Sequence, residues 1–158
     1  TPRFYVSGPH AAVVMELDGK GITVKAIGDK IGQASGIKMC YAALTKGTHT
    51  LHVALLTAAN KMGLTEDLRN EFEFSQKSHL NAMEKGISRL PANAHRWIGE
   101  MEEIASTFEH LGVTPNFHRG AAEIYRMLHA TPFAEETPET IDNDRTTWDT
   151  IDAVSNLD

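Results

Sequence analysis

The sequence contains few of the features that mark extracellular or membrane proteins. Its 158 residues include a single cysteine, Cys40, so no disulfide can form within the chain, and this usage fits a reducing compartment. No apolar run approaches the roughly 20 residues that span a bilayer, and no signal-peptide pattern is visible. We therefore expect a cytoplasmic protein without a membrane partner.

An initiator methionine is also missing, because the chain begins Thr1-Pro2-Arg3-Phe4 and enters a β-rich run at once. We expect a fragment of a longer protein. Its composition, 41% hydrophobic and 23% charged, is that of an ordinary globular domain. A chain of this length buries about 70% of its unfolded surface, which is enough for a real core.

Basic residues are almost absent from the C-terminal end. Between Glu135 and Asp158 eight acids face one arginine, Arg145, so this tail carries −7 of a total charge of −6 and the rest carries +1. A near-neutral body without a basic stripe argues against nucleic acid as a partner. We expect the acidic tail, residues 133–158, to be either a solvated extension or a short helix that docks through Trp148, Ile151 and Val154.

The first 30 residues predict a compact βαβ unit. Residues 4–6 and 22–27 are β-rich, and residues 11–17 between them suit a short helix. Such a unit has parallel strands and a right-handed crossover. Two strands are not stable alone, so we interpret residues 1–30 as the C-terminal end of a Rossmann-type domain. No Gly-x-Gly-x-x-Gly follows either strand, so the phosphate-cradling turn of a dinucleotide site is missing.

From Ile31 to Met62 the sequence has no proline and keeps a helical apolar pattern. Such a helix would run roughly 46 Å, and we expect it to be covered on most sides. Gly63 is expected to end it and Thr65 to cap the next helix. Prolines and glycines then delimit further helices at 65–74, 75–90, 92–111 and 115–128.

The fold class that follows is mainly α, a helical bundle around one long helix, preceded by the terminal βαβ remnant. The expected domains are residues 1–30, an all-helical substrate and dimerisation domain at 31–132, and the tail.

Helical spacing places Lys38, Tyr41, Thr45 and His49 on one stripe of the long helix. Lysine transfers protons near neutral pH when burial or positive neighbours lower its pKa. Lys38 is therefore either a catalytic group or an ordinary surface lysine, and Tyr41 and Thr45 either bind a ligand or pack against other helices.

The segment Gly32-Gln33-Ala34-Ser35-Gly36-Ile37-Lys38 resembles the substrate-side motif of β-hydroxyacid dehydrogenases and 6-phosphogluconate dehydrogenase. The resemblance implies that Lys38 is the general acid/base of an NAD(P)-dependent oxidation of a hydroxy acid or related alcohol, or of the reverse reduction. It implies NAD or NADP held mainly by a missing N-terminal domain, with Gly32 and Ser35 on the cofactor side. It also implies a homodimer in which the long helices pack together.

The motif departs from that family after the lysine. Relatives carry asparagine or histidine-asparagine where this chain has Tyr41 and Ala42, and 6-phosphogluconate dehydrogenase carries glutamate at the place of Thr45. The proton-transfer lysine is kept but its hydrogen-bonding neighbours change, so the substrate class is not fixed by the resemblance. Tyr41 and Thr45 can still bind a hydroxylated substrate.

A second block, residues 95–105, resembles the same C-terminal domain. Relatives carry a lysine-aspartate pair where this chain has Gly99-Glu100. Gly99 inside a helix suggests close approach of a ligand or backbone. Arg96 and Glu100 are candidate substrate-binding residues, and the alternative for Arg96 is an exposed pair with Glu100.

Two other patterns are weaker evidence of function. Ser35-x-x-Lys38 matches penicillin-recognising enzymes, but their companion motifs are absent. His49 and His52 could share a metal, but no carboxylate or cysteine on that helix completes the site, so no metal is expected. The alternatives to a hydroxy-acid dehydrogenase are a non-catalytic helical dimerisation module and an imine-reductase-like enzyme.

Overall fold

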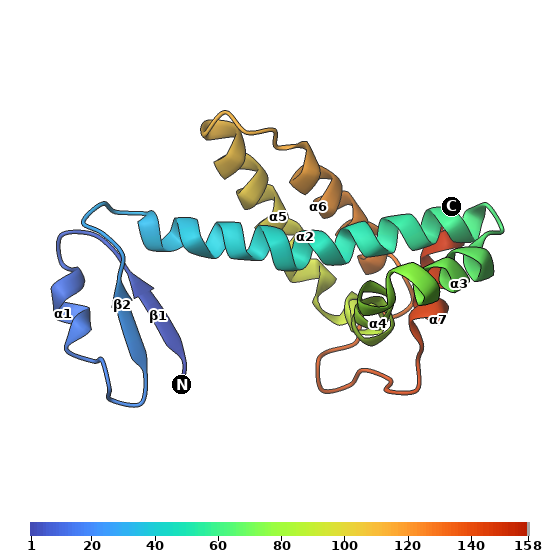
Figure 1. Cartoon of the computed structure of the whole chain (residues 1–158), viewed down its shortest axis with the longest axis horizontal. Helices are drawn as coiled ribbons and strands as arrows, with labels where there is room; N and C mark the ends of the chain where they lie inside the picture. The colour runs from blue at the N-terminus through green and yellow to red at the C-terminus, as the bar shows by residue number, and fades with distance from the viewer. Residues whose placement is uncertain (158) are drawn as a thin grey trace. The chain divides into compact units, whose positions relative to one another are not determined.

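The computed structural model describes residues 1–157, and Asp158, the last acid of the expected tail, lies outside the described residues. The chain divides into two compact units, residues 1–42 and the part from Ala43 onward. The division falls inside helix α2, Gln33–Lys61 (Figure 1). The domain limits expected near residues 30 and 132 stay a prediction, since compactness of this chain alone does not test them.

The first unit is the expected βαβ element. Strand β1, Arg3–Val6, is followed by helix α1, Ala11–Met15, and strand β2, Thr23–Ala26. The two strands are parallel, as predicted, and their register runs from Arg3 opposite Thr23 to Val6 opposite Ala26. Beyond the strands, the amide of Gly8 donates to the carbonyl of Gly28 at 3.1 Å, which extends the pairing into both loops.

A serine hydroxyl joins the loop after β1 to the start of α2. The amide of Ala34 donates to Ser7 Oγ at 3.0 Å across 27 positions of sequence. The first amides of a helix have no partner within the helix, so this bond satisfies one of them. It fixes the beginning of α2 against the βαβ unit.

Helix α2 ends as predicted. Gly63 has φ of +73°, its amide donates to the carbonyl of Asn60, and the amide of Leu64 donates to the carbonyl of Ala59. This pair of bonds is the Schellman motif, which needs a left-handed residue that glycine supplies without steric cost. The same arrangement occurs at Gly112, where the amide of Val113 reaches the carbonyl of Phe108.

The second unit is a helical bundle that contains the rest of α2. The chain order is α3, Thr65–Ser75; α4, Lys77–Gly86; a short 3₁₀ helix η1, Ile87–Arg89; α5, Pro91–His110; α6, Asn116–His129; and α7, Thr147–Ser155. Helices α5 and α6 pack as a hairpin (Figure 1). The core is built from apolar side chains of five helices and η1, among them Val53, Leu56, Leu80, Ile87, Met101, Ile104, Leu128, Ile151 and Val154. The predicted mainly-α fold is confirmed.

Two local expectations are wrong. Thr65 does not cap α3, because the helix already begins at Thr65 and the residue before it is Leu64, whose side chain cannot accept a hydrogen bond. Helix α2 is not covered on most sides in this chain, since Leu44 and Leu51 are 69% and 62% exposed. Of the two alternatives for the acidic tail, the docked short helix is confirmed over Thr147–Ser155, where Ile151 and Val154 are fully buried.

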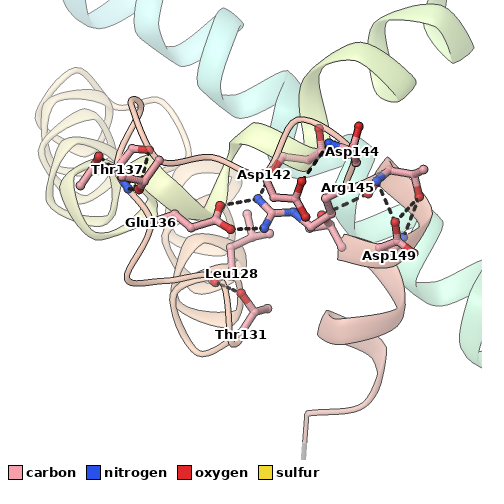
Figure 2. Close-up of polar contacts among 12 residues, drawn as sticks. Leu128, Thr131, Glu136, Thr137, Asp142, Asp144, Arg145 and Asp149 are labelled. Carbon is pink, nitrogen blue, oxygen red and sulfur yellow. Dashed lines mark hydrogen bonds and ion pairs between the residues drawn. The ribbon is translucent and has the colours of Figure 1, made fainter.

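A buried arginine fastens the tail to the bundle (Figure 2). The Arg145 guanidinium, with a side chain only 4% exposed, donates to both carboxylate oxygens of Glu136 and, at 2.7 Å, to the carbonyl of Ser88 in η1. It also lies 4.0 Å from the centre of the Phe133 ring. Bidentate arginine–carboxylate pairs are strong and directional, so the loop before α7 is fixed in one conformation.

The helix after that loop is capped and anchored. The Thr146 hydroxyl accepts from the amide of Asp149, and the amide of Thr146 donates back to the Asp149 carboxylate, which is a capping box. The hydrogen bond that the Thr146 hydroxyl donates to the Asp149 carboxylate, followed by the bond from the Thr146 amide, lowers the pKa of Asp149. The buried Thr147 hydroxyl then donates to the carbonyl of Met83 at 2.9 Å, so α7 is held against α4.

None of the helices within residues 1–157 combines the length and apolar character needed to cross a bilayer.

Replacing the tail arginine tests its role. Arg145→Ala leaves the Glu136 carboxylate and the Ser88 carbonyl without their donor, so we expect the free energy of unfolding to fall by about 3 kcal/mol. The matched control is Arg119→Ala, which removes the exposed ion pair with Glu109. This substitution should change the free energy of unfolding by less than about 0.5 kcal/mol. Urea titration followed by circular dichroism measures both. Equal effects of the two substitutions would contradict the buried-anchor interpretation.

Candidate functional site

Lys38 lines an open hollow within the first unit. The hollow measures about 710 Å³ and is formed by β1 and the first turns of α2, with Arg3, Phe4, Tyr5, Ala34, Ser35, Ile37, Lys38 and Tyr41 around it. Lys38 is exposed, but its side chain borders a concave surface rather than a flat one. The first unit alone therefore brings together Lys38, Ser35 and Tyr41 of the predicted site residues.

A second hollow of the first unit holds the predicted cofactor-side residues. Gly32 and Ser35 line it together with the loop from Val6 to His10 and the start of α1. Gly32 has φ of +95°, and a Cβ added there would meet no atom within 4 Å. The backbone before α2 is thus open on this side. The assignment of Gly32 and Ser35 to a cofactor stays a prediction.

Glu100 belongs to a polar cluster of the second unit. Its carboxylate forms an ion pair with the Lys46 ammonium of α2, which lies 5.3 Å from the centre of the Trp97 ring. The buried Tyr125 hydroxyl donates to the Lys46 carbonyl at 3.0 Å, and burial, followed by the charge of Glu100, raises the pKa of Tyr125 far above its usual range. This cluster joins α2, α5 and α6, and no sequence motif had indicated Lys46.

Arg96 and Glu100 of α5 have other partners than the sequence predicted. Arg96 is exposed and donates to the Asn93 side chain at 3.2 Å, whereas Glu100 is paired with Lys46, so the expected Arg96–Glu100 pair is wrong. Gly99 is exposed, and a Cβ there would meet nothing within 4 Å. No other segment of the described residues approaches Gly99, and the approach of a ligand to it stays a prediction. Thr45 is half-buried in the second unit.

Three histidines lie near one another on α2 and α4: His52 is buried, His49 is half-buried and His79 is exposed. The rings of His52 and His79 meet edge to face at 6.0 Å, and His49 Nδ1 is buried without a hydrogen-bond partner among residues 1–157. Across the described residues no three of histidine, cysteine, aspartate and glutamate lie close enough to hold a metal. Burial lowers the pKa of His49, and burial with the charges of His49 and His79 lowers that of His52.

The chain is similar to one protein family and to two solved structures. Residues 59–128 match a family described as a domain of unknown function, DUF1932. A crystal structure of a conserved hypothetical protein from Sinorhizobium meliloti 1021 superimposes with a TM-score of 0.78 and 25% identity, covering 96% of this chain and 50% of that one. Another, of a conserved protein of unknown function, gives a TM-score of 0.59 and 27% identity, covering 80% of this chain and 49% of that one. That second structure is described as similar to 3-hydroxyacid dehydrogenases.

The chain resembles the C-terminal domain of 3-hydroxyacid dehydrogenase-like proteins. The resemblance inferred from the lysine motif is thereby confirmed. A curated relative, an uncharacterized 28.5 kDa protein of Methanothermus fervidus, is 34% identical over 66 residues, which are 42% of this chain and 26% of that protein. The chain spans about half the length of the solved structures that it matches.

The histidine cluster predicts a pH-dependent stability. In the unfolded chain these imidazoles take up protons near their ordinary pKa of about 6.5, whereas in the folded chain the lowered pKa values of His49 and His52 delay protonation. At pH values between the lowered pKa of the folded chain and the ordinary pKa of the unfolded chain, the unfolded state binds more protons. The free energy of unfolding therefore rises with pH over this range. We expect the free energy of unfolding to be flat above about pH 7.5 and to fall as the pH decreases through about 6.5.

His52→Gln should flatten that fall, whereas His95→Gln, which removes an exposed imidazole of α5, should leave it unchanged. Urea titrations between pH 5 and 8 measure the slope. A fall of equal steepness in all three proteins would show that the buried imidazoles are not its source.

Proposed function

We propose that this chain is the substrate-side half of an NAD(P)-dependent oxidoreductase that oxidises a hydroxy acid or related alcohol, or reduces the corresponding carbonyl. The observation that carries the proposal is the position of Lys38, at the rim of a hollow between a parallel βαβ unit and the start of a long helix. The likeness to a structure described as similar to 3-hydroxyacid dehydrogenases supports the reaction class.

In this proposal Lys38 moves the hydroxyl proton. In the oxidation its neutral amine accepts the proton of the substrate hydroxyl as the carbonyl forms, and in the reduction its ammonium returns a proton to the carbonyl oxygen. The nicotinamide, when bound, supplies hydride acceptance or donation at the carbon. Tyr41 has a phenol beside the same hollow and is proposed to hydrogen-bond the substrate.

The described residues fit only part of a dinucleotide. Neither strand is followed by a glycine-rich phosphate turn, which is what holds a pyrophosphate in Rossmann-type sites. The hollow beside Gly32 and Ser35 can accept one end of the cofactor. We therefore propose that NAD or NADP is held mainly by another part of the whole protein, with Gly32 and Ser35 contributing from this chain.

Thr45, Arg96 and Glu100 remain proposed substrate ligands. They lie in the second unit, where Glu100 already has a cationic partner in Lys46 and Arg96 has Asn93. Of the three, Arg96 is the most accessible to an anionic group, because its guanidinium is exposed.

A specific observation favours a second function, a helical dimerisation module. Leu44 and Leu51 of α2 and Phe117 of α6, which are 69%, 62% and 79% exposed, line one apolar groove of the second unit. The floor of the groove includes Gly47 and Gly120, whose lack of side chains admits close approach. We propose that a second copy of the chain covers this groove, in an enzyme or in a non-catalytic assembly.

The lysine assignment is tested in the full-length protein with its nicotinamide-binding part. Lys38→Ala should lower kcat for hydroxy-acid oxidation by at least about 100-fold, with the circular dichroism spectrum unchanged. Lys61→Ala, an exposed lysine at the other end of α2, is the matched control and should keep full turnover. Unchanged turnover in Lys38→Ala would eliminate the proposed role. Activity confined to C=N substrates would favour the imine-reductase-like alternative.

The groove is tested by light scattering after size exclusion. Leu51→Asp places a charge in the groove and should convert a dimer into a monomer, because an unpaired buried charge at an interface is costly. Leu111→Asp changes an equally exposed leucine, 73% accessible, that does not line the groove, and should leave the dimer intact. A monomeric parent protein, or a dimer that survives Leu51→Asp, would overturn this interface.

A further inference from the structure

The hollow at Lys38 is lined by large apolar side chains that are exposed to solvent. Phe4, Tyr5, Ile37 and Tyr41 all line it and are 51%, 38%, 42% and 70% exposed. A contiguous set of large exposed apolar side chains marks a ligand or partner surface more often than an ordinary one. The walls of this hollow therefore suit a ligand with an apolar or aromatic body.

The same hollow carries positive charge without a compensating acid. Arg3 and Lys38 line it, and no aspartate or glutamate does. Within residues 1–157 neither cation takes part in an ion pair or hydrogen bond of its side chain, whereas Arg145, Arg119, Arg126 and Lys46 all have acidic partners. Two unpaired cations at a concave surface attract an anion.

Strand geometry places the arginine on the same face of β1 as an aromatic residue. Arg3 begins β1 and Tyr5 follows two residues later, so both side chains leave the same face of the strand. Arginine combines a planar fork of N–H donors, which matches a carboxylate, with a tendency to stack on aromatic rings. Lys38, on α2, borders the same hollow and lies at a different part of its rim.

We propose that Arg3 binds the carboxylate of the substrate through two N–H donors, and that the walls of the hollow select a hydroxy acid with an apolar body over a polyhydroxylated sugar acid. A sugar acid would lose water from several hydroxyls against Phe4 and Ile37, which offer no hydrogen bonds in return. This inference rests on the proposed function for the reaction but names the anchoring residue and the substrate class.

Binding to the chain itself is the first test. The probe is 3-phenyllactate, compared with gluconate, which is anionic but polyhydroxylated, and with 3-phenyl-1-propanol, which is aromatic but uncharged. In amide-resolved NMR titrations 3-phenyllactate should shift the resonances of residues 3–5 and 34–41, and the other two should bind at least tenfold more weakly. Equal binding of gluconate or of the alcohol, or no shifts at these residues, would overturn the proposal.

Substitution of the arginine is the second test. Arg3→Gln should raise the dissociation constant of 3-phenyllactate at least tenfold and Arg3→Lys by less, because a lysine keeps the charge but not the fork. Lys20→Gln, which removes an exposed cation of the same unit that does not line the hollow, is the matched control and should have no effect. An equal loss in Arg3→Gln and Lys20→Gln would mean that only net charge matters and would overturn the assignment of Arg3.

Kinetics of the full-length protein separate this inference from the proposed function. Arg3→Gln should raise KM for the hydroxy acid at least tenfold and change kcat little, whereas Lys38→Ala lowers kcat. If turnover depends on Lys38 but Arg3→Gln leaves KM unchanged, the carboxylate-binding role of Arg3 is overturned and the proposed dehydrogenase function stands. If 3-phenyllactate binds in an Arg3-dependent way but no hydroxy acid is turned over, the role of Arg3 stands and the proposed dehydrogenase function is overturned.

Discussion

The hydrogen bond from the Ala34 amide to the Ser7 hydroxyl is the constraint on which the candidate site depends. It satisfies a helix-terminal amide and at the same time joins the loop after β1 to the first turn of α2. Both hollows of the first unit lie beside this junction, one along β1 and the other along the loop that contains Ser7. Without the bond, the start of α2 would lose a direct hydrogen bond to the loop that follows the strand carrying Arg3.

The cations singled out in the two units differ in whether they are paired with an acidic side chain. In the second unit the Arg145 guanidinium is buried and donates through its two terminal nitrogens to Glu136 and the Ser88 carbonyl, and the Lys46 ammonium is paired with Glu100 beside an aromatic ring. Buried or half-buried cations require such partners because desolvation is costly. In the first unit Arg3 and Lys38 stay accessible and unpaired within the described residues. The buried and half-buried cations of the second unit therefore stabilise the fold, whereas the two cations of the first-unit hollow are accessible to a ligand.

Most helix limits could be predicted because their signals are local. Gly63 and Gly112 supply the left-handed conformation that two Schellman motifs need, and Pro91 begins α5. What the sequence left open or predicted wrongly concerns interactions between distant segments. The docking of α7 depends on Arg145 meeting Ser88, 57 positions away, and the state of Glu100 depends on Lys46, 54 positions away. The exposure of Leu44 and Leu51 was likewise invisible, since a helical pattern shows which residues are apolar but not whether another surface covers them.

The sequence by itself determined the element order, the parallel βαβ start, the long helix and the candidate lysine, because propensity, turn residues and motif spacing act over a few neighbouring positions. Tertiary structure alone decided which residues surround that lysine. Arg3 and Lys38 are far apart in sequence and no motif connects them, yet the folded first unit places both on one concave surface. The physical reason is that a ligand is recognised by side chains that converge in space, and convergence is produced by packing and by bonds such as that between Ala34 and Ser7.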